Sequence, residues 1–291
     1  MVGWQYFLSI MQASVKTYCI IGDPIDHSLS PAMQNAAFGA LGLNCVYIAF
    51  RVPIGELKES IDSMRSINIS GFNVTVPHKV EVIKLLDELD VTAKNAAAVN
   101  TVNNIEGIFR GYNTDIFGFI EPLHKRHVDF SGMRVLILGA GGAARAVVAA
   151  LAQEHGITKV LIANRDIRRA AVLAEIGKAL GLNCETAPIE GIQAVSSLHD
   201  LIVNATTLGM KNEPSIIDYR HISKGTIVYD IVYRPIVTDL IENAKYAQAT
   251  VVYGYEMLIE QGAKAFEIWT GLPAPRDTMK KNLLGIFGEP V

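Results

Sequence analysis

The 291-residue sequence has few cysteines, and the three present, Cys19, Cys45 and Cys184, form no CxxC motif or Cys/His cluster. A disulfide framework and a zinc site are therefore unsupported, and free thiols in a reducing cytoplasm are the simplest account. The sequence also lacks an apolar run long enough to span a bilayer, and its net charge is only -3. These absences predict a cytoplasmic protein with no metal site, no nucleic-acid partner and no membrane partner.

The first residues lack a basic segment and a small-residue cleavage site, so we expect no targeting signal there. Residues 1–11 are predicted to be a loosely attached N-terminal extension, and Met1 and Met11 are both candidates for the native start. Half of all residues are hydrophobic and 19% are charged, which is typical of a globular protein with a substantial core.

Strand-like runs and helical patterns alternate along the chain, which predicts an α/β fold with parallel strands. The predicted strands of the first part lie at 17–22, 45–50 and 73–76, its helices at 32–41, 55–64 and 79–89, and a hairpin joins 97–102 to 107–112. The second part has predicted strands at 133–138, 159–163, 201–204, 227–230 and 250–252, and helices follow at 257–269 and 276–287. We predict two lobes: an N-terminal α/β substrate domain (12–115 and 257–291) and a Rossmann-type dinucleotide-binding domain (116–256).

A lysine follows one of the predicted strands at a short distance. Pro77 must end the β-branched run Val74–Val76, because proline has no N–H for a ladder. Lys79 therefore lies just past the carboxyl end of a strand, where open α/β sheets place their ligands. A solvated surface ammonium is the ordinary interpretation of a lysine. The alternative is a lysine that a rigid loop holds for proton transfer.

A glycine-rich turn joins the strand at 133–138 to an alanine-rich helix. Glycine in such a turn lets the backbone approach a pyrophosphate, whose charge the helix N-terminus stabilises. A lone glycine cluster is often only a tight turn, but the strand, turn, helix and second strand together favour a dinucleotide site. The predicted cofactor-binding residues of the turn are Gly139, Ala140, Gly141, Gly142 and Ala143.

The end of the next strand bears on the choice of cofactor. An acidic residue there would accept the ribose 2′-hydroxyl of NAD, whereas arginine would pair with the 2′-phosphate of NADP. Asn164 and Arg165 occupy this place and Arg169 follows one turn later, so NADP is preferred. Asp166 either neutralises an arginine or itself reaches the ribose, which leaves NAD open. Solvated charges at a helix start are the structural alternative.

Short hydroxyl and amide side chains gather near the ends of several first-lobe strands. Ser28, Ser30, Thr75 and Asn100 are each, taken singly, ordinary turn or cap residues. Together they offer neutral donors and acceptors to a polyhydroxylated ligand, with Lys79 as the nearby cation. Asp115, at the seam between the lobes, is a candidate partner for that lysine.

The sequence resembles the shikimate dehydrogenase family, including its quinate/shikimate relatives, from about Tyr18 to Gly285. Several blocks in order carry this resemblance. In the first lobe they are Gly22-Asp23-Pro24 with His27–Pro31, then Gly71–Lys79, Ala98–Val102 and Gly111–Asp115. In the remainder they are Gly139–Ala143, Asn204–Met210, Gln261-Gly262 and Trp269–Gly271.

The resemblance implies a role for each matching residue. Lys79 and Asp115 would be the catalytic pair, and the expected reaction is the reversible NADPH-dependent reduction of 3-dehydroshikimate to shikimate in chorismate and aromatic amino-acid biosynthesis. The shikimate pocket would be lined by Ser28, Ser30, Thr75, Asn100, Tyr233 and Gln261. The cofactor would be held by Gly139–Ala143 and Asn164–Arg169, with Ile231 and Gly254 near the nicotinamide.

Two departures from the family pattern keep alternatives open. Gln34 stands where many members have histidine, and it also occurs in some quinate-using relatives. Asp166 stands where NADP-specific members usually have threonine. A quinate/shikimate dehydrogenase that uses NAD or NADP is therefore the main rival, and a homodimer is also open. A non-catalytic nucleotide-binding regulatory module on the same fold would be expected to lack Lys79 or Asp115, and both are present.

Overall fold

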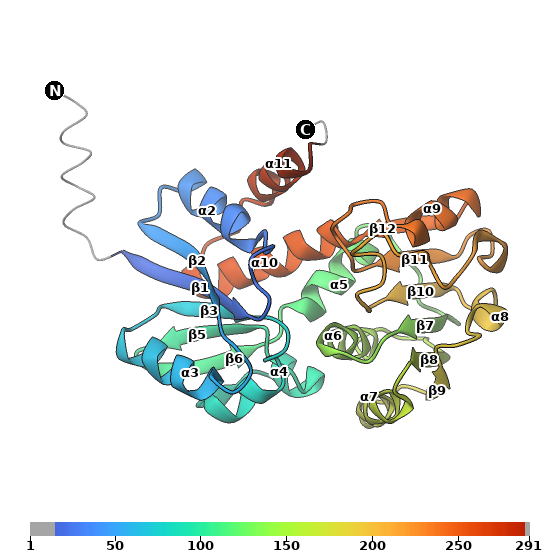
Figure 1. The fold of residues 1–291 in the computed structure, drawn as a ribbon, viewed down its shortest axis with the longest axis horizontal. Helices are drawn as coiled ribbons and strands as arrows, with labels where there is room; N and C mark the ends of the chain where they lie inside the picture. The colour runs from blue at the N-terminus through green and yellow to red at the C-terminus, as the bar shows by residue number, and fades with distance from the viewer. Residues whose placement is uncertain (1–14, 289–291) are drawn as a thin grey trace. The chain divides into compact units, whose positions relative to one another are not determined.

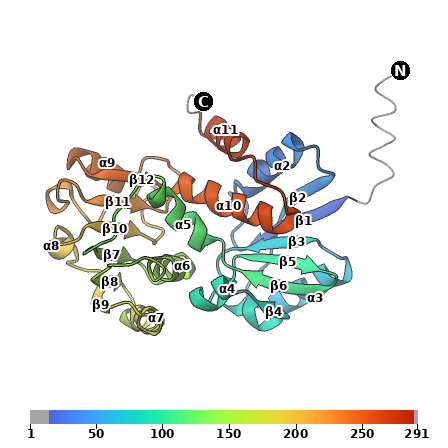
Figure 2. The ribbon, with the colours of Figure 1, turned by 180° about the vertical axis from the view of Figure 1, so that it is seen from behind.

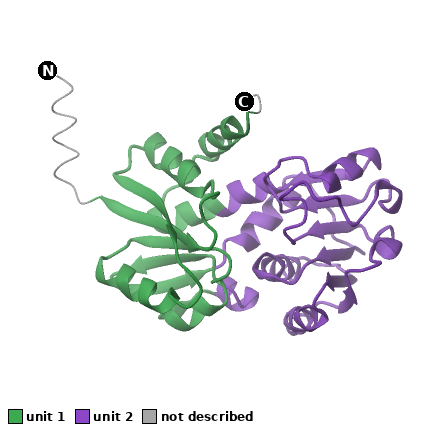
Figure 3. Cartoon of the chain, in the orientation of Figure 1, with its two compact units in different colours: residues 1–90, 99–112, 262–291 green, residues 91–98, 113–261 purple. Residues whose placement is uncertain are grey.

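Two six-stranded sheets organise the chain in the computed structural model of the protein, which describes residues 15–288 (Figure 1). The chain divides into two compact units (Figure 3). Of the described residues, the first unit takes those up to Asp90, Val99–Tyr112 and those from Gly262 onward, and the second takes Val91–Ala98 and Asn113–Gln261. The predicted N-terminal extension and the choice between Met1 and Met11 lie outside the described residues.

The sheet of the first unit is mixed. Its strand order is β2 (Cys45–Arg51), β1 (Lys16–Gly22), β3 (Gly71–Val74), β5 (Thr101–Ile105), β6 (Ile108–Tyr112) and β4 (Glu88–Leu89). β1 pairs in parallel with β2 and β3, as predicted, and β5 and β6 form the predicted antiparallel hairpin. The hairpin begins at Thr101 rather than residue 97, because α4 (Val91–Ala96) precedes it and Ala97 leaves that helix with a φ of 47°.

The predicted helix over 79–89 is wrong. The segment forms only a short 3₁₀ helix, η1 (Glu81–Leu85), followed by β4. Leu86 is extended, and the next residue joins β6: the Asp87 N–H donates to the Phe109 carbonyl at 3.0 Å, and its carboxylate accepts from the Phe109 N–H at 2.7 Å. This pairing with β6 competes with the helical hydrogen bonds and ends the helix early.

An aromatic cluster forms the core of the first unit, beneath α10 (Gly254–Thr270). The Trp269 ring stacks on Tyr18 with centroids 4.9 Å apart and lies 5.9 Å from Tyr47, and its indole N–H donates to the Val102 carbonyl at 3.0 Å. Three further helices belong to this unit: α2 (Ser30–Ala40), α3 (Leu57–Ser66) and α11 (Arg276–Phe287). α2 and α11 lie side by side in both views (Figures 1 and 2).

The sheet of the second unit is wholly parallel. Its order is β12 (Thr250–Tyr253), β11 (Ile227–Asp230), β10 (Leu201–Asn204), β7 (Arg134–Leu138), β8 (Lys159–Asn164) and β9 (Cys184–Pro188). Numbered along the chain, this is the order 6-5-4-1-2-3 of dinucleotide-binding folds. The predicted Rossmann-type architecture is confirmed. β9 was not predicted from the sequence, because its residues are mostly exposed and therefore form no apolar run.

Alternate residues of β7 face two separate cores, as a two-sided sheet requires. Val135 and Ile137 belong to the core on the side of α5 (Asp115–His124) and α6 (Gly142–Leu151). Leu136 and Leu138 belong to the core on the side of α9 (Asp239–Tyr246). The remaining elements are α7 (Ile167–Ala179), α8 (Gln193–Ser196) and η2 (Tyr219–His221). Between residues 15 and 288, no helix has both the length and the apolar character that a membrane span requires.

We expect Gly71→Ala to lower the free energy of unfolding by about 1–3 kcal/mol, because overpacking a dense core forces side chains or backbone to shift. A Cβ at Gly71 would lie 2.5 Å from Trp269 Nε1 and 2.8 Å from the Val102 carbonyl oxygen. Gly39→Ala is the matched control: Gly39 is an exposed residue of α2 with nothing within 4 Å of an added Cβ. Its midpoint in urea should stay equal or rise. A Gly71→Ala midpoint equal to that of wild type would contradict this account.

Candidate active site

The turn that carries Lys79 is fixed by hydrogen bonds on both sides. The Thr75 N–H donates to the Ile21 carbonyl at 2.9 Å, and the His78 N–H donates to the Thr75 carbonyl at 3.0 Å. The buried His78 ring contacts the Val52 carbonyl through Nε2 at 2.7 Å, and the Lys79 carbonyl accepts from the Val99 N–H at 2.8 Å. The backbone of Lys79 is therefore held in place at the carboxyl end of β3, while its side chain is half-buried.

A buried chain of polar side chains connects Tyr47 to the predicted substrate residue Asn100. The phenol of Tyr47 donates to Asn73 Oδ1 at 2.6 Å. Asn73 Nδ2 donates to the Asn100 carbonyl at 3.0 Å and to Thr101 Oγ1 at 2.9 Å. Burial raises the pKa of Tyr47 well above its usual value, so the phenol stays protonated. The structure thus places Asn100 in a buried hydrogen-bond network of the first unit.

Ser28, Ser30 and Thr75 lie in neighbouring loops of the first unit. The Ser28 hydroxyl oxygen accepts from the Ser30 N–H at 3.3 Å, and Ser30 is the first residue of α2. Gly22, the last residue of β1, allows Thr75 to approach: a Cβ there would lie 2.4 Å from Thr75 Cγ2. The loop after β1 is therefore held against the segment that leads to Lys79, since the Asp23 N–H also donates to the Val76 carbonyl at 2.9 Å.

Asp115 and Gln261 belong to the second unit, on two helices in close contact. Asp115 is the buried first residue of α5, and Gln261 lies in the middle of α10. The helices approach at Gly118, where a Cβ would lie 2.7 Å from the Cβ of Gln261 and 2.9 Å from the Met257 carbonyl oxygen. One glycine three residues after Asp115 thus allows the packing that fixes both predicted site residues. Lys79 belongs to the other unit, so its pairing with Asp115 stays a prediction.

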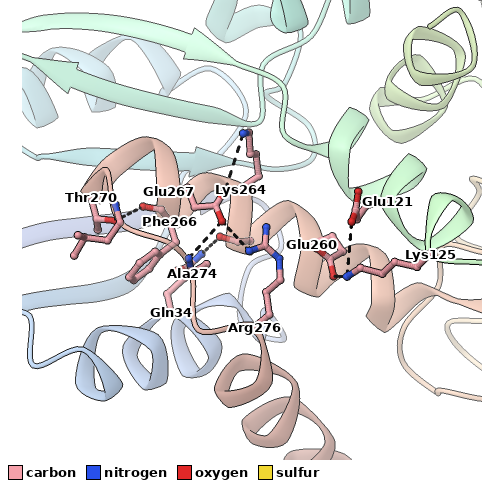
Figure 4. Close-up of polar contacts among 12 residues, drawn as sticks. Gln34, Glu121, Lys125, Glu260, Lys264, Phe266, Glu267, Thr270, Ala274 and Arg276 are labelled. Carbon is pink, nitrogen blue, oxygen red and sulfur yellow. Dashed lines mark hydrogen bonds and ion pairs between the residues drawn. The ribbon is translucent and has the colours of Figure 1, made fainter. Parts of the chain in front are cut away.

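Ion pairs along α10 fix this helix in each unit (Figure 4). In the second unit, Lys125 donates to the buried Glu260 at 2.5 Å. In the first unit, Arg276 donates to Glu267 at 2.7 Å, and Gln34 Nε2 donates to the Gly262 carbonyl at 2.8 Å. These contacts hold α10 on both sides of Gln261, whose side-chain amide donates to the Leu258 carbonyl at 2.9 Å.

The glycine-rich turn has two positions that need glycine for different reasons. Gly139 has a φ of 108°, and a Cβ there would lie 2.8 Å from the Ala205 carbonyl oxygen, so this glycine is required by the fold. Gly141 precedes α6 with a φ of -92°, and a Cβ there would have nothing within 4 Å. A side chain at Gly141 would therefore meet no protein atom, and the turn is of the kind that holds a pyrophosphate at the helix N-terminus.

Asp166 is engaged by its own helix. It is the N-cap of α7, where its carboxylate accepts from the Arg168 N–H at 3.0 Å and from the Arg168 guanidinium at 3.3 Å. The Arg168 guanidinium, and then the Arg168 N–H, lower the pKa of Asp166. Of the two roles open to Asp166 from the sequence, the structure shows it neutralising an arginine. Arg165 and Arg169 are exposed near the end of β8, beside Asn164.

Arg145 is a cation at this edge that was not among the predicted cofactor-binding residues. It lies in the first turn of α6 and is half-buried, and its pKa is lowered by burial and then by the charge of Arg169. Two guanidinium groups that repel each other at the ends of β7 and β8 are suited to a dianion such as the 2′-phosphate of NADP. The position of Arg145 directly after the glycine-rich turn, next to Ala144, is the sequence signal that could have identified it.

Ile231, Tyr233 and Gly254 lie at the carboxyl ends of β11 and β12. Gly254 allows the segment after β11 to pass closely, because a Cβ there would lie 2.4 Å from the Ile231 carbonyl oxygen. The structure therefore brings Ile231 and Gly254 together. Tyr233 is half-buried three residues beyond β11, and burial raises the pKa of its phenol.

A buried carboxylate, Asp230, ties these loops together. Its oxygens accept from Asn204 Nδ2 at 2.9 Å, from the Val232 N–H at 3.0 Å and from the Thr238 hydroxyl at 2.6 Å. Burial raises the pKa of Asp230 to about 6, and these three hydrogen bonds oppose that rise. Asn204 also holds the loop after β10, through Thr206 and the Leu208 carbonyl. The loop after β11, which contains Ile231, is thus fixed to the end of β10.

Known proteins resemble the chain along most of its length. Family models match at residues 20–102 (shikimate dehydrogenase substrate binding domain), 122–228 (shikimate/quinate 5-dehydrogenase) and 254–284 (shikimate 5′-dehydrogenase C-terminal domain). The shikimate dehydrogenase (NADP(+)) of Nitrosopumilus maritimus (strain SCM1) is 48% identical over 272 residues, which cover 94% of this chain and 99% of that protein.

Two solved structures show the same similarity at the level of the fold. A shikimate dehydrogenase in complex with NADP+ has a TM-score of 0.86 at 38% identity, covering 94% of this chain and 96% of that one. The quinate dehydrogenase of Corynebacterium glutamicum in complex with NAD has a TM-score of 0.85 at 32% identity, covering 92% and 98%. Both structures were solved in complex with a nicotinamide cofactor.

We expect Gly141→Ala to weaken NADP+ binding at least tenfold while the melting temperature stays within 2 °C of wild type, because the methyl group would occupy the approach to a pyrophosphate. Gly139→Ala should instead lower the melting temperature, since its strain lies in the fold. Titration calorimetry with NADP+ and thermal unfolding of both variants separate the two effects. Unchanged NADP+ affinity in Gly141→Ala would show that the pyrophosphate lies elsewhere.

Proposed function

The chain belongs to the shikimate dehydrogenase family, and from this premise we propose that it catalyses the reversible NADPH-dependent reduction of 3-dehydroshikimate to shikimate. The observation that carries the proposal is 48% identity to a shikimate dehydrogenase (NADP(+)) across 94% of this chain and 99% of that relative. The chain also has a lysine whose backbone is held by hydrogen bonds just after β3, and a glycine-rich turn suited to a dinucleotide.

Lys79 is the proposed proton-transfer residue. The nicotinamide supplies or accepts the hydride, so the protein must position the substrate and move one proton at the oxygen of the reacting carbon. A lysine ammonium can donate that proton in the direction of reduction, and the amine can take it back in oxidation. The hydrogen bonds of His78 and Lys79 fix the backbone of the turn, which limits the positions that the ammonium can reach.

Asp115 is the proposed partner of Lys79, with the role of orienting the ammonium and binding a neighbouring substrate hydroxyl. Its position at the first turn of α5 is favourable for a carboxylate, because the helix N-terminus stabilises negative charge. The proposed substrate-binding residues are Ser28, Ser30, Thr75, Asn100, Tyr233 and Gln261. All six provide uncharged hydrogen-bonding groups, which suits a ring bearing several hydroxyls.

The second unit is the proposed cofactor domain, and the first unit the proposed substrate domain. Gly139–Ala143 would hold the pyrophosphate, and Arg145, Arg165 and Arg169 would surround the 2′-phosphate. Ile231 and Gly254 would lie near the nicotinamide. Because Asp166 is already engaged by Arg168, it is poorly placed to accept a ribose hydroxyl, which favours NADP over NAD. The cytoplasmic location and a homodimer remain proposals from the sequence.

A quinate-using enzyme is the second candidate, and one observation favours it: the similarity to the quinate dehydrogenase of Corynebacterium glutamicum. Gln34 bears on this alternative. It is fully buried and donates to the carbonyl of Gly262, the neighbour of Gln261. Gln34 can therefore influence substrate choice by setting the position of Gln261.

Turnover of two substrates with two cofactors tests the proposal. We expect the absorbance of the reduced nicotinamide to rise fastest with shikimate and NADP+, more slowly with shikimate and NAD+, and least with quinate. Similar rates with quinate would favour the second candidate. Absence of turnover with all four combinations would refute the proposed function.

We expect Lys79→Ala to lower kcat by about 10²–10⁴-fold, the usual contribution of a positioned general acid or base, with a small change in the KM for shikimate. Lys84→Ala is the control, since Lys84 is an exposed lysine of η1 five positions further on. Steady-state kinetics of both variants, at saturating cofactor, provide the measurement. If only KM rises in Lys79→Ala, the lysine is a binding residue.

A further inference from the structure

A single buried carboxylate holds both ends of the loop that follows β11. The Asp230 side chain accepts from the Val232 N–H at 3.0 Å, two positions further along the chain, and from the Thr238 hydroxyl at 2.6 Å, eight positions further along. Asp230 has no exposed surface, so bulk water does not compete for its oxygens. The two ends of the segment 231–237 are therefore held together by one side chain.

The same carboxylate ties this segment to the loop after β10. Asp230 Oδ1 accepts from Asn204 Nδ2 at 2.9 Å, and this nitrogen also donates to the Leu208 carbonyl at 3.1 Å. Asn204 Oδ1 accepts from the Thr206 N–H at 3.1 Å and from the Thr206 hydroxyl at 2.7 Å. Because a backbone carbonyl can only accept, the amide of Asn204 must direct its nitrogen to Leu208 and to Asp230. A turned amide would place its oxygen against a carbonyl and a carboxylate.

The hydrogen-bonding groups around Asp230 fit its ionised form. Among the described residues, they are the Asn204 amide, the Val232 N–H and the Thr238 hydroxyl, and all three donate. A proton on Oδ1 would face two of these donors. A proton on Oδ2 would compete with the proton of Thr238, whose oxygen already accepts from the Ile241 N–H at 3.3 Å. Protonation of the carboxylate would therefore loosen the arrangement.

Burial, and not a charged neighbour, sets the ionisation of this carboxylate. Burial raises the pKa of Asp230 to about 6, its three hydrogen bonds oppose that rise, and no charged neighbour among the described residues contributes. On the loops after β10 and β11, on α9 and at the end of β12, the half-buried titratable side chains are Glu213, Tyr233, Asp239 and Tyr253, and the exposed charged ones are Lys211, Arg234, Glu242 and Lys245.

We propose that the ionised Asp230 is a positioning residue for the reaction: by holding both ends of the segment 231–237 and joining it to the loop after β10, it sets the positions of Ile231 and Tyr233. This inference rests on the proposed function, which places Ile231 near the nicotinamide and Tyr233 in the substrate pocket. Loss of the charge should impair turnover of shikimate. It should leave the 2′-phosphate end of the cofactor unaffected, because the residues proposed for that end lie after β7 and β8.

Asp230→Asn keeps the shape of the side chain and removes its charge. We expect kcat/KM for shikimate to fall about ten- to hundredfold, the range for hydrogen bonds to a charged group. The inhibition constant of adenosine 2′,5′-bisphosphate, a probe that has the 2′-phosphate but no nicotinamide, should equal that of wild type. Asp239→Asn is the matched control, since Asp239 accepts from the Ser215 N–H at 2.7 Å and from Asn243 Nδ2 at 3.1 Å, outside the segment 231–237. Its kcat/KM should equal that of wild type.

The pH dependence separates positioning from a general loss of stability. As the pH falls through about 6, Asp230 gains a proton and should come to resemble asparagine, so the ratio of wild-type to Asp230→Asn kcat/KM should fall toward one. Stability changes in the opposite direction. A carboxyl whose pKa is raised from its ordinary value of 3.8 stabilises the folded state on protonation, so wild type gains stability relative to the variant as the pH falls. A ratio that follows the free energy of unfolding, or that does not change with pH, would overturn the inference.

If Asp230→Asn does not fold, Thr238→Val provides a second test, because it removes the donor at the far end of the segment. We expect kcat/KM for shikimate to fall about two- to tenfold, the range for one hydrogen bond, whereas Thr238→Ser, which keeps the hydroxyl, should equal wild type. An unchanged kcat/KM in Asp230→Asn or Thr238→Val would overturn the inference, while wild-type turnover leaves the proposed function standing. A wild type that does not turn over shikimate with NADP+ would overturn both.

Discussion

The hydrogen bond from Asn73 to the backbone carbonyl of Asn100 is the contact on which the polar arrangement of the first unit depends. It exists because β3 pairs in parallel with β1 on one side and antiparallel with β5 on the other. The antiparallel partner brings the start of β5 to the carboxyl end of β3, with Asn73 opposite Thr101. A wholly parallel sheet would have placed Asn100 at the opposite edge, far from the turn that leads to Lys79.

The second unit is organised by close backbone approaches and one buried charge. Gly139, Gly118 and Gly254 each lie where a Cβ would come within 3 Å of a neighbouring backbone oxygen. Gly139 and Gly254 bring loops at the carboxyl edge close to each other, and Gly118 allows α5 to pack on α10. Asp230 connects β11 to β10 and to the start of α9. An ionised carboxylate without exposure is costly to bury, as its raised pKa indicates. The three hydrogen bonds of Asp230 therefore serve mainly to select one arrangement of the loops, and not to raise the free energy of unfolding.

Much of the fold could be predicted from the sequence because its strands are apolar runs with clear ends. The parallel strands β7, β8, β10 and β11 are buried on both faces, so each reads as an uninterrupted hydrophobic segment. β9 and the 3₁₀ segment at residues 81–85 were not predicted correctly, for opposite reasons. β9 is an edge strand with exposed polar residues, whereas the helical pattern after Lys79 was overridden by tertiary pairing of Asp87 with β6.

The candidate site was predictable only where a residue's role depends on its neighbours in sequence. The glycine turn and the segment around Lys79 meet this condition, and the family resemblance supplied the other residues. Tyr47, Asn73 and Asp230 do not meet it, because their importance comes from partners between 8 and 27 positions away. A tyrosine in a strand or an aspartate at its end has no distinguishing local pattern. Only the three-dimensional pairing shows that these side chains orient others.

The preference between NADP and NAD illustrates the same limit at a single carboxylate. An acidic residue near the end of the second strand of such a fold suggests a ribose acceptor, yet what matters is where its oxygens point. Asp166 begins α7, and the N-cap geometry directs its carboxylate to the Arg168 N–H and guanidinium. The negative charge of Asp166 is thereby neutralised within α7. Arg145, Arg165 and Arg169 keep the carboxyl edge of the sheet positive. A carboxylate that caps a helix therefore raises no barrier to a 2′-phosphate, although the sequence alone places it at the position where one would be expected.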